Sequence, residues 1–250
     1  MDKKKADKIL TIVLWVLIVA NAVPLLWYGT RVFVADRFVI KGESMEPTLH
    51  TGEGVWVNKL LMGARIYTKF DFDDSPELHC FRMPGLRKLR VGDVAIFNYP
   101  YGRSGDTVAF KINYVYCKRC WGTPGDTVRI VGGIETPDSV LLRMRMLRAG
   151  QFAGEGANWT TKDFGPIVVP KKGMTIALDS VARKHYARVI RWETGVTVGK
   201  ITHSNSQNYT FRQDWYFFVG DNVTNSRDSR FFGFVPADFV VGIVPSKKKV

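Results

Sequence analysis

The pattern of hydrophobic positions separates one long apolar run from many short ones. Residues 9–30 carry no charged side chain, and Arg31 ends the run. As a helix, this run rises about 33 Å, enough to cross the hydrocarbon core of a bilayer. Trp27 and Tyr28 lie where an interfacial aromatic belt is expected. The run is too long for a typical signal-peptide core, so we predict an uncleaved membrane anchor rather than a cleaved signal peptide or a buried core helix.

Beyond the anchor, the hydrophobic runs are short and rich in β-branched and aromatic residues, which indicates strands. Gly, Pro, Asp or Asn separates them. They are RFVIKG, GVWVNKL, VGDVAIFNYP, DTVAFKINYVY, GDTVRIVGG, GPIVVP, MTIAL, ARVIRW, WYFFVGD and DFVVGIV. VLLRMRMLRAG fits a helix or a strand, and no segment after residue 31 sustains a helical period for long. We therefore predict a mainly β fold: an N-terminal transmembrane helix followed by a β-sheet core.

One shift in composition suggests a second unit within this β fold. Residues 134–213 are richer in Arg and polar residues than the segments on either side, which are dense in Gly-Asp turns. We therefore predict a β core formed by residues 31–133 and 214–250, with a smaller β lobe at 134–213 inserted into it.

The charge of the chain predicts its neighbours. A net charge of +13 suggests a polyanionic partner, either nucleic acid or an anionic membrane. Residues 1–8 carry four lysines, and lysines before a span favour a cytoplasmic N-terminus. Residues 1–8 are then a cytoplasmic basic segment, and the chain after about residue 31 lies outside the membrane. This placement predicts contact with membrane lipids and no nucleic-acid partner.

Two sets of residues suggest other kinds of site. A Ser-His-Asp triad stays open, because triad members are adjacent in space rather than in sequence. None of the four histidines lies in a distinctive stretch, however, and we interpret each as a surface or hydrogen-bonded histidine. They are His50, His79, His185 and His203.

Cys117 and Cys120 have the C-x-x-C spacing of redox and zinc sites. A structural zinc site needs four ligands, and no second Cys/His pair is present. In a strand, residues three apart point to opposite faces, so these thiols would not easily bond to each other. We predict separate buried thiols, no metal and no cofactor, and leave a redox role open.

Two residues carry candidate chemistry. Ser44 lies between a predicted strand and Pro47, where a serine is either an ordinary turn residue or a held nucleophile. Lys118 lies in a predominantly apolar strand. It either reaches solvent or is buried with a depressed pKa, and a neutral lysine can accept the proton of a serine hydroxyl. The segment 220–236, GDNVTNSRDSRFFGFVP, is either a turn-rich hairpin or a loop that holds a hydroxyl against the lysine.

Taken in order, these segments resemble the type I signal peptidases. The anchor is followed by SMEPTL, RVGDVAIF, KRCWGTPGDTV and GDNVTNSRDSRFFGFVP. Each is a short pattern that can occur by chance, but four in order behind an anchor form a specific signal.

The resemblance implies a role for seven residues. Ser44 is the expected nucleophile and Lys118 the general base. Ser226 resembles the serine that orients the lysine, Asp228 and Arg230 resemble a bracing pair, and Gly220 resembles a glycine that leaves room beside the site. Gly42 stands where some members add a hydroxyl to the oxyanion hole, so we expect the Ser44 backbone N–H to hold the oxyanion.

The 220s loop departs from the commoner charged pattern of the family. Val223 and Thr224 stand where Arg and Asp are frequent. This departure weakens the inference about how the loop is braced, and leaves the inference about Ser44 and Lys118 unchanged.

The implied function is that of a serine endopeptidase with a Ser/Lys dyad that removes N-terminal signal peptides from exported preproteins. It implies a single-pass protein of the bacterial plasma membrane, with the catalytic β core on the extracytoplasmic side. An extended preprotein with small side chains at the first and third positions before the cut would lie beside the strands. Two alternatives remain: a membrane-anchored β-domain binder without catalysis, and a self-cleaving Ser-Lys repressor, which should carry a DNA-binding helical domain.

Overall fold

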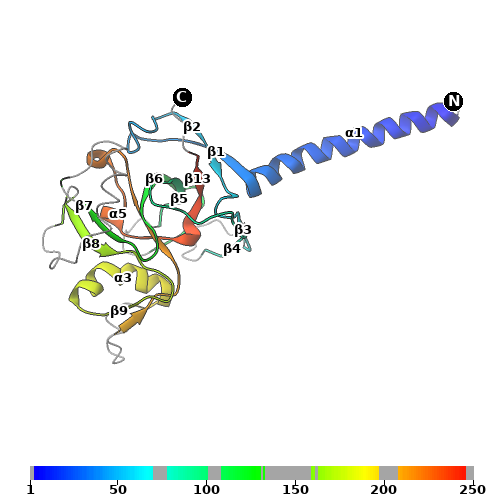
Figure 1. Ribbon diagram of the computed structural model, residues 1–250. Coiled ribbons are helices and arrows are strands. Elements are labelled where there is room, and N and C mark those ends of the chain that lie inside the picture. Colours follow the sequence, from blue (N-terminus) through cyan, green and yellow to red (C-terminus); the bar gives the residue numbers. More distant parts are fainter. Residues whose placement is uncertain are drawn as a thin grey trace.

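The computed structural model describes residues 3–69, 78–100, 108–130, 132, 159–160, 163–196 and 208–245. Helix α1 (Lys3–Gly29) projects from a β-rich body, and a π-helical turn at Thr30–Val34 joins the two (Figure 1). Within the described residues, one helical stretch, Asp7–Val34, is long and apolar enough to cross a membrane, with a mean hydropathy of 2.6. None of that stretch is buried against the body. The apolar helix predicted over residues 9–30 is therefore confirmed.

The body is built on a seven-stranded sheet of order β1-β2-β13-β5-β6-β11-β12, in which all neighbours are antiparallel. Its strands are β1 (Ala35–Val39), β2 (Gly54–Asn58), β13 (Val240–Val244), β5 (Val94–Asn98), β6 (Val115–Gly122), β11 (Trp215–Val219) and β12 (Val235–Pro236). Three two-stranded pairs join β3 (Arg65–Tyr67) to β4 (Cys80–Arg82), β7 (Thr127–Ile130) to β8 (Phe164–Val168), and β9 (Thr175–Ala177) to β10 (Asn208–Thr210). The predicted mainly β fold is confirmed.

Strand β6 separates two hydrophobic clusters, because successive side chains of a strand point to opposite faces. Cys117 packs against the smaller cluster, which contains Ile96, whereas Cys120 lies within the larger cluster around Phe97 and Phe218. Both cysteines are free thiols, as predicted, with Cys120 buried and Cys117 half-buried. Burial raises the pKa of Cys117 to about 12, so this thiol stays protonated near neutral pH.

The described part of residues 134–213 contains β8, β9, β10 and a helix, α3 (Ser180–Thr194). The prediction of a strand at ARVIRW is therefore wrong, as is the expectation of no sustained helical period. Asp179 caps α3 by accepting a hydrogen bond from the Ala182 N–H at 2.7 Å, and Gly195 ends it in the left-handed conformation at φ 71°. The buried side chains recur at helical spacing: Ala182, Tyr186, Val189 and Ile190. Whether residues 134–213 form a separate lobe stays a prediction.

The strand predicted at DTVAFKINYVY is shorter than expected. The chain turns at Ile112 and Asn113, and β6 begins only at Val115. The buried Asn98 side chain donates hydrogen bonds to the backbone oxygens of Lys111 (2.7 Å) and Ile112 (3.0 Å), which holds this turn in place. VLLRMRMLRAG, which fitted a helix or a strand, lies outside the described residues.

Candidate active site

The sheet curls so that a turn following its edge strand meets a strand from its middle. Ser44 lies in the turn after β1, and Lys118 lies on β6, which is not a neighbour of β1. The Lys118 amine and the Ser44 hydroxyl are nevertheless hydrogen-bonded to each other. The Asn222 N–H, in the loop after β11, donates to the Ser44 carbonyl at 3.1 Å. Three segments far apart in sequence therefore converge on one serine.

Lys118 is buried with only 4% of its surface exposed. Burial lowers the pKa of its amine below the ordinary value of 10.5, and the Arg230 guanidinium lowers it further. Asp228, Cys117 and Asp221 oppose this lowering without reversing it. The lowering favours the neutral amine, which can accept a proton, and the hydrogen-bond partner of the amine in this structure is a serine hydroxyl. A serine and a lysine in this arrangement can act as a nucleophile and its general base.

Ser226 is buried close to this pair. A Cβ added to Gly220 would collide with the Ser226 hydroxyl and with the backbone oxygen of Ser44, so only glycine permits the close approach at position 220. The Ser226 hydroxyl donates to Asp228 Oδ2 at 2.7 Å and makes no hydrogen bond to Lys118 in the described structure. Its role in orienting the lysine stays a prediction.

Asp228 and Arg230 form a bidentate ion pair. Arg230 Nε and Nη2 donate to the two oxygens of Asp228, each at 2.8 Å, and the two side chains are 1% and 0% exposed. Asp228 Oδ2 also accepts from the Gly220 N–H at 3.0 Å, and Arg230 Nη2 donates to the Val223 carbonyl at 2.8 Å. The pair ties the end of β11 to the loop that follows, which is the geometry expected of a brace.

The positive φ of Gly42, 87°, explains why a glycine stands two residues before Ser44. The next residue is held from the opposite loop: the Glu43 carbonyl accepts from Asn222 Nδ2, and the Glu43 carboxylate accepts from Asn225 Nδ2, both at 3.2 Å. Gly42 thus allows the backbone a positive φ before Ser44, and it has no side chain that could donate a hydrogen bond to an oxyanion.

Sequence reasoning missed a second buried ion pair beside the dyad. Arg119 donates to both oxygens of Asp221, from Nε at 2.7 Å and from Nη2 at 2.5 Å. Thr48 Oγ1 donates to Asp221 Oδ2 at 2.5 Å, which anchors the Ser44 turn to the loop after β11. The sequence offered one clue to this pair: each member is adjacent to a predicted site residue, Arg119 to Lys118 and Asp221 to Gly220.

The described histidines lie elsewhere. His50 forms an exposed pair with Glu46, His79 lies 3.5 Å from Lys69, and His185 stacks on Trp159. His203 lies outside the described residues. The structure gives no support to a Ser-His-Asp triad at Ser44.

Comparison with known proteins identifies the family of this chain. The model of the family described as signal peptidase, peptidase S26, matches residues 9–247. The chain belongs to this family. It is 30% identical to the Signal peptidase I of Pseudomonas aeruginosa over 222 residues, which cover 88% of this chain and 63% of that relative. The Signal peptidase I T of Bacillus subtilis is 27% identical, with 85% of this chain and 72% of the relative covered.

The Signal peptidase I of Aquifex aeolicus is 24% identical, with 85% of this chain and 75% of that relative covered. The matched part spans 63% of the length of both the P. aeruginosa and the Pseudomonas fluorescens relatives. The peptidase S26 family thus accounts for nearly the whole of this chain, but not for the whole of its longer relatives.

The buried Arg119–Asp221 pair should contribute strongly to the stability of the folded chain. Asp221→Asn removes the charge that neutralises a buried guanidinium, and we expect the free energy of unfolding to fall by about 3–5 kcal/mol. Urea unfolding of the full chain, followed by tryptophan fluorescence, measures the change.

The matched control is Lys88→Gln. It removes an ion pair with Asp214 in which Lys88 is 85% exposed, and it should cost less than about 1 kcal/mol. A similar small loss for both variants would show that the buried pair does not brace the site.

Proposed function

We propose that this chain is a membrane-bound serine endopeptidase that removes N-terminal signal peptides from exported preproteins. The observation that carries the proposal is the hydrogen bond between the Ser44 hydroxyl and the amine of buried Lys118. Membership of the S26 family and relatives named Signal peptidase I support the same reaction. A self-cleaving repressor is disfavoured because the described N-terminal segment is a single long apolar helix.

In the proposed mechanism, neutral Lys118 takes the proton of the Ser44 hydroxyl as Ser44 Oγ attacks the carbonyl carbon of the scissile peptide. The resulting ammonium protonates the leaving amine, and an acyl-enzyme remains on Ser44. Lys118 then accepts a proton from the water that attacks this ester and gives it to Ser44 Oγ as the acyl–oxygen bond breaks, which restores the free serine and the neutral amine.

The oxyanion of each tetrahedral intermediate needs a donor already in place. Among the described residues, none accepts a hydrogen bond from the Ser44 N–H, so this group is available to the oxyanion. The Asn222 bond to the Ser44 carbonyl fixes the peptide plane on the other side of the same residue. We assign the oxyanion donor to the Ser44 backbone N–H, with no side-chain contribution from position 42.

The remaining site residues act on the dyad through its surroundings. Gly220 permits the close approach of the loop to Ser44, and the Asp228–Arg230 pair holds that loop. We propose that the Ser226 hydroxyl oxygen accepts a hydrogen bond from the lysine ammonium when it forms, while the hydroxyl proton stays bonded to Asp228. These are positioning roles, and the substrate side chains before the cut are expected to be small at the first and third positions.

The proposed location is the bacterial plasma membrane, crossed once by the apolar helix. The cluster of lysines in residues 1–8 favours the cytoplasm for the N-terminus, and the body then lies on the extracytoplasmic side. In this arrangement, residues 31–133 and 214–250 form the catalytic core, with 134–213 as the inserted lobe.

Contact with lipid is proposed for the outer face of β1 and β2, the first strands after the anchor. Val39 and Trp56 on this face are 56% and 54% exposed, and Arg37 pairs with Trp56 across the two strands. An aromatic ring next to a cation is suited to the interfacial region of an anionic membrane. Met45, next to Ser44, is 1% exposed and belongs to the core, so it is not part of this face.

Replacing either member of the dyad should abolish cleavage. We expect Ser44→Ala and Lys118→Ala each to lower kcat/KM by about 10³-fold or more. Lys118→Arg should fail as well, because arginine keeps its proton in proteins. The assay incubates the purified full chain in detergent with a preprotein and sequences the N-terminus of the product, with exposed Lys171→Ala as the control.

A catalytically silent binder would release no product from any of these proteins, including the wild type. Product release at the wild-type rate by Ser44→Ala would instead remove the nucleophile assignment.

The lowered pKa of Lys118 predicts the pH dependence of cleavage. Only the neutral amine accepts a proton, so kcat/KM should rise with pH through the folded-state pKa of Lys118, with a midpoint below 10.5. Circular dichroism at each pH controls for unfolding. A rate that is flat or falls over this rise would contradict a lysine base.

The lipid-contact proposal predicts a substrate-dependent effect of Trp56→Ser. Cleavage of a preprotein embedded in anionic vesicles should slow several-fold, whereas cleavage of a short soluble peptide should not change. Val196→Ser, at an exposed apolar position just after α3, is the matched control. Equal slowing with both substrates would mean that Trp56 acts on the site rather than on the membrane.

A further inference from the structure

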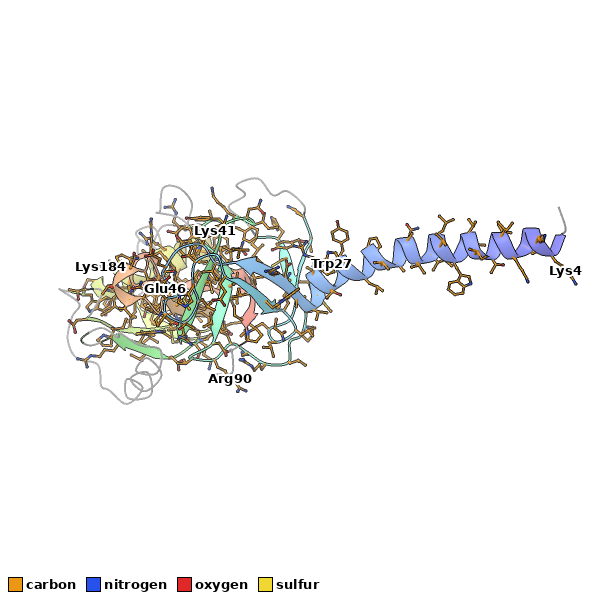
Figure 2. All side chains as sticks on the ribbon, turned by 90° about the horizontal axis from the view of Figure 1, so that it is seen from above. Lys4, Trp27, Lys41, Glu46, Arg90 and Lys184 are labelled. Atoms are coloured by element: carbon orange, nitrogen blue, oxygen red, sulfur yellow. The ribbon has the colours of Figure 1, made fainter. Side chains whose placement is uncertain are left out.

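One asparagine in the loop after β11 binds two successive carbonyls of the Ser44 turn. The Asn222 N–H donates to the Ser44 carbonyl at 3.1 Å, and Asn222 Nδ2 donates to the Glu43 carbonyl at 3.2 Å. In Figure 2, Lys41 and Glu46 mark the two ends of this turn, and both lie on the body rather than along α1. The backbone bond needs only an N–H at position 222, whereas the second bond needs a side-chain donor of this length.

The orientation of the Asn222 amide follows from its partners. A carbonyl oxygen only accepts hydrogen bonds, so the end of the amide that faces Glu43 is the NH₂ group. The amide oxygen then faces its own loop, where Thr224 Oγ1 donates to Asn222 Oδ1 at 3.4 Å. The Asn225 N–H donates to the Asn222 carbonyl at 3.0 Å. The half-buried side chain is therefore held between the turn and the loop that carries it.

The Glu43 carbonyl shares a peptide plane with the Ser44 N–H. The bond between these two residues is trans, so the carbonyl and the N–H point in opposite directions. A second donor, the Glu46 N–H, binds the same carbonyl at 3.1 Å. The two donors fix the direction of the Glu43 carbonyl, and the planar peptide thereby fixes the direction of the Ser44 N–H.

This direction matters because the Ser44 N–H is the donor that we assign to the oxyanion. A donor stabilises a developing charge best when it already points at the place where the charge forms. Gly42 has no side chain that could compensate for a misaligned N–H. Asn225, by contrast, binds the Glu43 carboxylate through its Nδ2 at 3.2 Å, a contact that does not act on the peptide plane.

We propose that the Asn222 side chain is a positioning residue that aims the Ser44 N–H at the oxyanion. The inference rests on the proposed peptidase function. Asn222 acts through the Glu43 carbonyl rather than through Lys118, so its loss should change the stability of the tetrahedral intermediate and leave the base as it is.

The test compares Asn222→Ala with Asn225→Ala in the purified full chain in detergent, with a preprotein as substrate. Removing an oxyanion donor altogether lowers kcat by about 10²–10³-fold. A misaligned donor loses part of that effect, so we expect Asn222→Ala to lower kcat at least tenfold. KM should stay within twofold, and the pH midpoint of kcat/KM should not move. Asn225→Ala changes the same loop and the same partner residue, and it should lower kcat less than threefold.

A peptide aldehyde with the substrate sequence gives a second readout. The hemiacetal that it forms with Ser44 carries an oxygen at the oxyanion position, so Asn222→Ala should weaken its inhibition at least tenfold and Asn225→Ala should not. Asn222→Asp keeps the size of the side chain but places an acceptor against the Glu43 carbonyl. At the high-pH plateau it should lose at least as much kcat as Asn222→Ala. Equal far-UV circular dichroism and urea midpoints exclude unfolding as the cause.

Three results would overturn this role of Asn222: an unchanged kcat in Asn222→Ala, an equal loss in Asn225→Ala, or a loss that comes as a higher KM or a shifted pH midpoint. With an active wild type, each of them refutes the role of Asn222 alone. A wild type that releases no product refutes the proposed function, and this role with it.

Discussion

The burial of one lysine is the constraint on which the site depends. An amine loses favourable hydration when it leaves water, so Lys118 on β6 resists protonation. A carboxylate nearby favours the ammonium and so opposes this lowering of the pKa. The two acidic residues that approach the dyad, Asp221 and Asp228, are each bound to an arginine through both oxygens. Asp228 and Asp221 still raise the pKa of Lys118 and Arg230 lowers it, but burial outweighs these charges.

The contacts that hold the site come from separate segments of the chain. Thr48 and Arg119 both hold Asp221, so the turn after β1 is fixed to β6 through one carboxylate. The backbone bond from Asn222 to Ser44 adds a second link between the same turn and the loop after β11. If the hydroxyl and the amine were on flexible segments, bringing them together would cost conformational entropy. Here the folding of the sheet has already fixed their positions.

The sequence predicted those parts of the fold whose signal is local. The uncharged run that forms α1 and the alternation of Cys117 and Cys120 on β6 needed only the period of a helix or a strand. Helix α3 was missed because ARVIRW, seen alone, is short and β-branched. Its helical pattern appears only when Asp179 and Gly195 are included as caps. DTVAFKINYVY was predicted as one strand because the turn within it depends on a side chain from another strand, Asn98.

In the candidate site, too, the sequence indicated the residues that lie in short motifs but not the contacts between distant segments. Ser44 and Lys118 were found through a family resemblance in short motifs, and the resemblance also drew attention to Asp228 and Arg230. The Arg119–Asp221 pair joins residues about a hundred positions apart, and no local pattern shows that two charges will be buried against each other. The Ser226 hydroxyl likewise donates to Asp228 and not to Lys118, and the sequence does not show which of these two residues it bonds.

The junction between helix and body limits how far the dyad can lie from the membrane. Lys59 Nζ donates to the Arg31 carbonyl at 2.5 Å and lies 3.7 Å from Asp36, while Arg31 itself bonds to Asp36 at 2.9 Å. These contacts fix the start of β1 against the end of the apolar stretch. Ser44 follows Val34 by ten positions, and even a fully extended chain of that length spans at most about 36 Å. If the helix crosses the bilayer as proposed, Ser44 therefore lies within this distance of the membrane surface from which a membrane-embedded substrate emerges. Strand β1, which connects the helix to the Ser44 turn, determines that distance.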